Sequence, residues 1–166
     1  ITSLGLGISS LGLIFYINNV FGAGPQVTGL FGSVWFVAYL IGCFALQPLG
    51  RKILPRWSLL CATISMSLTC GLILVARSLP IVFALYAAFG FVTALFWPPL
   101  MGWLSREMEG KELAKASARF NVSWSLGGVL APFLGGVFAE INPILPAVAA
   151  VACFALCGAF ILTASL

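Results

Sequence analysis

The chain has 166 residues, of which 61% are hydrophobic and only 7% are charged. A typical soluble domain is about 45–50% apolar and about 25% charged, so this composition excludes a soluble globular domain. Disordered chains are poor in apolar residues, and the same numbers therefore exclude intrinsic disorder. One membrane-spanning helix needs about 20 apolar residues, so the length accommodates six spans.

Glycine, proline and charged residues divide the chain into six apolar segments. These cover residues about 1–21, 26–49, 57–76, 81–104, 116–139 and 144–166. Several of the segments are preceded by proline, which is well tolerated at the first position of a helix. The segments are apolar on all sides, whereas strands of a membrane barrel alternate between apolar and polar residues. We therefore predict an all-α membrane protein with six transmembrane helices.

Basic residues gather in two connections between the predicted helices. Seven of the eight lie there: Arg51, Lys52 and Arg56 in one connection, and Arg106, Lys111, Lys115 and Arg119 in or beside the other. Loops rich in Lys and Arg stay on the cytoplasmic side, which predicts a plasma-membrane protein with both ends of this segment in the cytoplasm. We interpret these residues as orientation signals and expect no nucleic-acid partner. The Glu107–Lys111 spacing suggests a short surface helix.

The fifth segment carries two stripes of small residues at a spacing of four. One consists of Gly127, Ala131, Gly135 and Ala139, and the other of Gly128, Pro132 and Gly136. Small residues let helix backbones approach closely within a membrane. Pro132 removes a backbone hydrogen bond and is expected to bend the helix. Two interpretations remain open: ordinary helix packing, or a helix that packs tightly and also flexes.

These features together resemble the amino-terminal half of a major facilitator superfamily transporter. Gly127-x-x-x-Ala131-Pro132-x-x-Gly135-Gly136 is similar to the family's signature in helix 5, with Ala131 in place of one glycine. Gly50-Arg51-Lys52 is similar to the end of its signature between helices 2 and 3. The resemblance implies twelve helices in two halves, each half built from two inverted three-helix repeats. It also implies that helices 1 and 4 line a central cavity, helices 2 and 5 face the other half, and helices 3 and 6 face lipid.

The sequence departs from the family pattern at its charged positions. The signature's aspartate, arginine and first glycine correspond to Gln47, Pro48 and Cys43, and the arginine of helix 4 corresponds to Tyr86. The resemblance therefore does not carry the family's aspartate-based charge relay, or arginine-assisted proton coupling, over to this chain.

Aromatic residues within the helices are the candidates for contact with a solute. Tyr16, Tyr39, Tyr86 and Trp97 are candidates for the cavity, with anchoring at the membrane interface as the alternative. The motif Gly127, Ala131, Pro132, Gly135 and Gly136 is the candidate for a gate or packing contact. Gly50, Arg51 and Lys52 form the candidate cytoplasmic loop motif.

The chemistry absent from the sequence also narrows its function. The chain has no histidine, the commonest metal ligand and general base, so we expect no enzyme, catalytic residue, metal or cofactor. Ser65 and Ser67 are lone hydroxyls expected to bond to their own helix. No Asp or Glu lies at mid-membrane depth, and such residues usually mark proton and ion pathways.

We therefore predict a half-transporter that moves an uncharged or amphipathic small molecule by alternating access. The expected partners are that small molecule, the lipid bilayer and a second six-helix half, in the same chain or in a dimer partner. The alternative is a stand-alone six-helix scaffold or channel without transporter activity.

Overall fold

The computed structural model describes residues 1–106 and 108–163, without the side chain of Arg51. Its helices are α1 (Thr2–Phe21), α2 (Pro25–Ala45), α3 (Gln47–Lys52), α4 (Pro55–Val75), α5 (Leu79–Thr93), α6 (Trp97–Leu104), α7 (Gly110–Ile141) and α8 (Leu145–Thr163). In this described part, six helical stretches are long and apolar enough to cross a membrane, the fourth being Leu79–Leu104, which joins α5 and α6. The predicted all-α membrane fold is confirmed.

The helices differ from the predicted segments mainly where a span bends. The second segment is divided at Leu46, where α2 ends and the short α3 begins. At the other connection, the structure has no separate surface helix in its described residues, because α7 already begins at Gly110. The expected partner Glu107 lies outside those residues. At a rise of 1.5 Å per residue, the 32 residues of α7 extend about 48 Å, well beyond a hydrocarbon core about 30 Å thick.

The fourth span is broken between α5 and α6 by two adjacent prolines. Pro98 and Pro99 lack the N–H groups that would bond to the carbonyls four residues earlier, and the chain makes turns over residues 94–96. One of these carbonyls, on Leu95, instead accepts a hydrogen bond from the Ser58 hydroxyl of α4 at 2.9 Å. The Leu95 carbonyl that the break frees is therefore paired with a neighbouring helix, as a backbone within a membrane requires.

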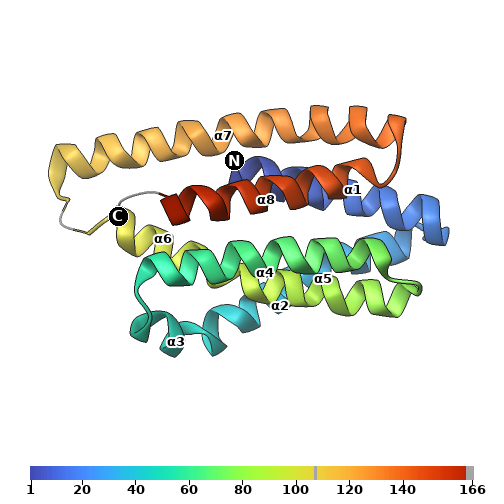
Figure 1. Ribbon diagram of the computed structural model, residues 1–166, viewed down its shortest axis with the longest axis horizontal. Helices are drawn as coiled ribbons and strands as arrows, with labels where there is room; N and C mark the ends of the chain where they lie inside the picture. Colours follow the sequence, from blue (N-terminus) through green and yellow to red (C-terminus); the bar gives the residue numbers. More distant parts are fainter. Residues whose placement is uncertain (107, 164–166) are drawn as a thin grey trace.

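Helix packing repeats between the first three spans and the last three. α1 packs on α7 and α8, α5 packs on α2 and α4, and α4 packs on α8. If the first, second and third spans are exchanged for the fourth, fifth and sixth, the same pairs of helices result. The connections alternate between the two ends of the bundle (Figure 1), so corresponding helices run in opposite directions. This is the arrangement of an inverted repeat.

The contact between α1 and α7 depends on residues without long side chains. A Cβ on Gly7 would overlap the Cβ of Ala131, and a Cβ on Gly127 would overlap the Ser3 hydroxyl. Gly127, Ala131 and Gly135 are all buried in α7. One stripe of small residues therefore faces α1 at backbone distance.

The other small-residue stripe of α7 has a different environment. Side chains on Gly128 and Gly136 would meet nothing within 4 Å, and Pro132 between them is exposed. One stripe therefore faces a neighbouring helix, and the other faces space that no described side chain fills.

The corresponding contact between α2 and α5 is equally close. A Cβ on Gly90 would lie 2.5 Å from the Trp35 carbonyl oxygen, and one on Gly42 would lie 2.6 Å from that of Phe91. Both distances are too short for a real Cβ atom. Glycine is thus required in both of the crossings that the repeat relates.

The helices α4 and α8, the third spans of the two repeats, pack on each other. Ser67 of α4 donates a hydrogen bond to the Val151 carbonyl oxygen of α8 at 3.2 Å. The expectation that Ser67 bonds within its own helix is therefore wrong, because α8 comes close enough for its backbone to accept the bond.

Charged residues described by the structure lie toward the ends of the bundle. We call the end that carries α3 and the connection between α6 and α7 the basic end, shown at the left of Figure 1. The basic end carries Lys52, Arg56, Lys111 and Lys115, and the opposite end carries Arg77 and Glu140. Arg56 donates through Nη2 to the Leu162 carbonyl oxygen at 2.7 Å, which satisfies a group at the end of α8.

The packing predicts opposite effects for the same substitution in the two stripes of α7. Gly127→Ala places a methyl group against Ser3 and should destabilise the protein by about 1–3 kcal/mol. Gly136→Ala adds a methyl group in open space and should stabilise the helix by up to about 1 kcal/mol. Thermal unfolding of the full-length protein in detergent measures both, and equal shifts would contradict the packing.

The bond at the helix break predicts a second effect on stability. Ser58→Ala leaves the Leu95 carbonyl without its partner, which should cost about 1 kcal/mol or more. Ser33→Ala is the matched control, because the Ser33 hydroxyl only bonds to Gly29 in its own helix on an exposed face. An unfolding temperature lowered equally by the two substitutions would argue against a specific role for Ser58.

Candidate functional site

A cavity of about 500 Å³ lies where α1, α2, α5, α6 and α7 meet. Its lining includes six aromatic side chains, Trp35, Phe36, Tyr86, Phe89, Trp97 and Trp124, and we call it the aromatic cavity. None of the described residues that line it is charged. Its described lining includes no residue of α3, α4 or α8.

Helical spacing explains how α1 and α2 reach the aromatic cavity. On α2, Gly32, Trp35 and Phe36 line the cavity, and residues three and four apart share one face of a helix. On α1, the lining residues Ser3, Gly7 and Ser10 follow the same rule. The glycine contacts of α1 with α7 and of α2 with α5 fix these faces toward one another.

The aromatic rings lie at defined angles. Trp97 and Trp124 are perpendicular, with ring centroids 4.7 Å apart. Trp35 is stacked on Tyr39 at 5.4 Å, and Tyr86 is stacked on the buried Phe31 at 4.0 Å. Such contacts restrict the rings, so the wall is held in place by the protein itself.

One polar group of the wall lacks a partner. The indole Nε1–H of Trp35 is buried and has no hydrogen-bond partner among the described residues. Leaving a buried donor unsatisfied costs about 1–3 kcal/mol, and buried polar groups in proteins are nearly always paired. The Ser10 hydroxyl, by contrast, donates to the Gly7 carbonyl at 3.0 Å.

Pro132 leaves one backbone carbonyl of α7 without its usual helical partner. Pro132 has no N–H, and the carbonyl that a helix would pair with residue 132 belongs to Gly128. Gly128 lines the aromatic cavity. The wall therefore combines ring faces with a few uncharged polar groups, a composition suited to binding small molecules.

The predicted cavity residues occupy three different places. Tyr86 and Trp97 line the aromatic cavity. Tyr39 lies in an adjoining hollow of about 440 Å³, which shares Trp97 with the aromatic cavity. Tyr16 is buried, packs edge-on against Phe21 with centroids 5.9 Å apart, and does not line either space.

Sequence reasoning did not select several residues that line the cavity. Trp35 and Phe36 were missed, although Gly32, Trp35, Phe36 and Tyr39 follow one face of a helix. Ser3 and Ser10 were missed as well. Their spacing with Gly7 is a helical stripe of small residues, which was recognised only on the fifth segment.

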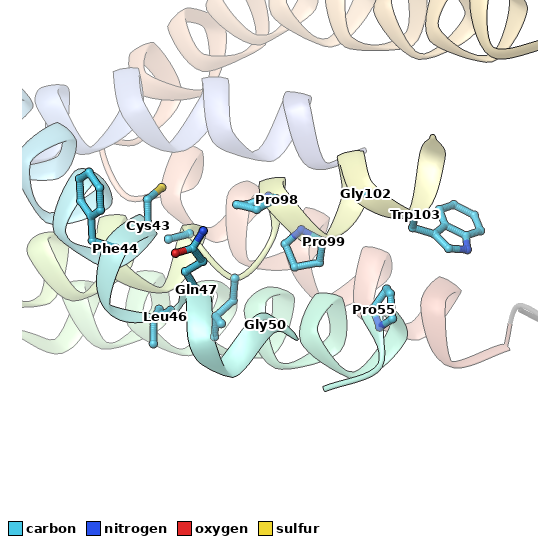
Figure 2. A pocket seen from close by; sticks show the side chains of 12 residues that line it. Cys43, Phe44, Leu46, Gln47, Gly50, Pro55, Pro98, Pro99, Gly102 and Trp103 are labelled. Carbon is cyan, nitrogen blue, oxygen red and sulfur yellow. The ribbon is translucent and has the colours of Figure 1, made fainter. Parts of the chain in front are cut away.

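A second pocket, of about 580 Å³, opens at the basic end between α2, α3, α4 and the α5–α6 break (Figure 2). It is lined by Gln47 and Gly50 of the α3 segment and by Pro98 and Pro99 of α6. Figure 2 shows the Gln47 amide directed toward the space between α3 and α6. Lys52 is exposed nearby, and the side chain of Arg51 lies outside the described part.

The described residues contain no group of three or more His, Cys, Asp or Glu that could hold a metal ion. The described lining residues of the aromatic cavity and of the pocket at the basic end are all uncharged. The features that stand out in the described residues are thus two apolar pockets and the breaks in the second and fourth apolar segments.

Comparison with known proteins agrees with this arrangement. Two MFS-type transporters of Mycobacterium tuberculosis, from strains H37Rv and CDC 1551, are each 38% identical to the chain over 86 residues. That stretch is 52% of this chain and 20% of each relative, so the match covers a small part of those proteins. No solved structure gives a significant match. The sequence profile of the Major Facilitator Superfamily matches residues 1–166, and the chain therefore belongs to this superfamily.

Proposed function

We propose that the chain is the amino-terminal half of a secondary transporter that moves a small solute across a membrane by alternating access. Membership of the superfamily supports transport. The observation that carries the proposal is the aromatic cavity, which lies between the first and fourth spans and is flanked by the second and fifth. In this mechanism, the solute binds near the middle of the membrane while two halves rock around it.

The exposed surfaces of α2 and α7 support a second half as partner. Only 11% of the spanning window of α2 and 17% of that of α7 are buried, against 39–44% for the other spans. Both helices flank the aromatic cavity. We propose that a second six-helix half, in the same chain or in a dimer partner, covers them, and that the outer faces of α4 and α8 contact lipid.

The charge distribution supports an orientation. We propose that the basic end faces the cytoplasm of a cell whose plasma membrane holds the protein, because Lys and Arg are enriched in cytoplasmic loops. In this orientation, the proposed cytoplasmic loop motif of Gly50, Arg51 and Lys52 forms the end of the short helix α3, in the connection between the second and third spans. Gly127, Ala131, Pro132, Gly135 and Gly136 then belong to a helix whose bend contributes to gating.

The lining of the aromatic cavity supports an uncharged or amphipathic solute. A buried charge is costly unless it is paired, and no charged residue lines the cavity to pair with one. We also propose that any carboxylate coupling transport to an ion lies outside these six spans. Aromatic surfaces and a few hydrogen bonds would then provide the binding energy.

Two-sided access of Ser10 tests alternating access without knowledge of the substrate. Ser10 lines the aromatic cavity near the middle of α1. After replacement of the native cysteines, Ser10→Cys in the full-length protein should react with a membrane-impermeant maleimide from either side. Right-side-out and inverted vesicles provide the two measurements.

Leu68→Cys is the control, because Leu68 is 61% exposed on the outside of α4 and should contact lipid. It should remain unlabelled from both sides. Labelling of Ser10→Cys from one side alone would contradict alternating access and favour a static scaffold.

A further inference from the structure

We propose that the outer face of α7 at the basic end binds an anionic phospholipid, with Lys115 and Arg119 holding the phosphate and apolar side chains contacting an acyl chain. A shallow groove of about 420 Å³ marks the site, and we call it the α7 groove. Its described lining lies on α7 alone and is exposed: Lys115, Ala118, Arg119, Val122, Ser123 and Leu126.

The α7 groove lies on a separate side of its helix. Successive residues of a helix are about 100° apart, so the two cations and the two large apolar residues, Val122 and Leu126, fall within about 60° of one another. The same geometry places all four at least about 120° from Gly128, which lines the aromatic cavity, and from Ala131, which packs against α1. A second half that covers the cavity side of α7 therefore leaves this face to lipid.

The length of α7 places the groove at the level of lipid headgroups. Residues 120–139 carry no charge and extend about 30 Å at 1.5 Å per residue, which equals the thickness of a hydrocarbon core. Arg119 then lies at the edge of that core, and Lys115 lies about 6 Å farther out. The headgroup layer is about 5–8 Å thick on each side of a bilayer, so both cations reach it.

The order of the lining residues along α7 matches the order of groups in a phospholipid. Val122 and Leu126 are 60% and 59% exposed, and they lie about 4.5 and 10.5 Å from Arg119 on the hydrocarbon side. A phospholipid likewise has its phosphate at headgroup depth and its acyl chains below. A free phosphate would contact the two cations and leave the apolar part of the groove uncovered.

The two cations select an anionic headgroup. Among the described residues, neither Lys115 nor Arg119 forms an ion pair, although Glu112 lies one turn before Lys115. Arginine forms charge-assisted, frequently paired hydrogen bonds with phosphate, and clustered Lys and Arg at a membrane surface attract anionic lipids. Phosphatidylcholine carries a quaternary ammonium beside its phosphate, which the two cations repel.

Native mass spectrometry of the purified full-length protein in detergent tests the site through binding of the first lipid. Dioleoyl phosphatidylglycerol should bind more tightly than dioleoyl phosphatidylcholine, which has the same acyl chains. Lys115→Gln and Arg119→Gln should each weaken phosphatidylglycerol binding about fivefold, and the double variant about 25-fold, because each change removes one cation from the headgroup. Phosphatidylcholine binding should change less than about twofold.

Lys111→Gln is the matched control on the same helix. It removes the same charge, but Lys111 lies about 12 Å beyond Arg119 and so past the headgroup layer. This variant should change phosphatidylglycerol binding less than about twofold. Equal losses in the three single variants would overturn the site, because attraction to the net charge alone would then explain the binding.

A soluble headgroup separates a phospholipid from a free phosphate. Glycerol 3-phosphate carries the phosphate without acyl chains, and an excess of it should leave phosphatidylglycerol bound. Displacement of the lipid by glycerol 3-phosphate would contradict the assignment to a phospholipid.

A photoreactive residue separates a lipid from the second half as the occupant of the α7 groove. The full-length protein with p-benzoylphenylalanine in place of Val122, in phosphatidylglycerol nanodiscs, should gain the mass of one lipid on illumination. A crosslink to another segment of the protein would instead show that protein covers the groove, and the proposal would be wrong.

The lipid site and the proposed function fail in different ways. If Ser10→Cys reacts from both sides but the α7 groove binds no phosphatidylglycerol, the lipid site is wrong and the transport proposal stands. If phosphatidylglycerol binds as expected but Ser10→Cys reacts from one side only, the lipid site stands and the transport proposal is wrong.

Discussion

Backbone contact at glycine positions is the constraint on which this fold depends. Within a membrane no hydrophobic effect drives helices together, so they associate where small residues let them touch. Gly7 and Gly127 bring α1 against α7, and Gly90 brings α5 against α2. Because the inverted repeat relates these two crossings, the same physical rule holds the first span on the fifth and the second span on the fourth.

The aromatic cavity follows from the same contacts. With α1 held on α7 and α2 held on α5, the remaining faces of these helices enclose a space that large rings line and that glycine leaves open. The break before α6, where Ser58 bonds to the Leu95 carbonyl, precedes Trp97, the residue that α6 contributes to the wall. On α7, packing and binding use different faces, whereas Ser3 and Gly7 of α1 take part in both. A substitution on α7 can therefore affect one and spare the other.

Hydropathy and the spacing of small residues predict much of this arrangement, because both reflect local chemistry. They predict six spans, and they identify the α7 stripe in which Gly127, Ala131 and Gly135 are buried. The break at Leu46 was not predicted. Pro98 and Pro99 do indicate a kink near the basic end of the fourth span, but the sequence does not show which neighbouring helix pairs with the carbonyl that they free. Ser67 and Trp35 show the same limit: their partners, or lack of them, depend on helices distant in sequence.

The account's central claim is that the two faces of α7 have separate roles, packing on one and solvent-accessible binding on the other. A cysteine scan of residues 121–136 in the full-length protein, read by a water-soluble maleimide, measures this directly. Reactivity should be greatest at positions lining the aromatic cavity and its adjoining hollow, Asn121, Trp124 and Gly128. It should be least at Gly127, Ala131 and Gly135, which face α1. A profile without helical periodicity, or one with its maximum on the Gly127 face, would contradict the account.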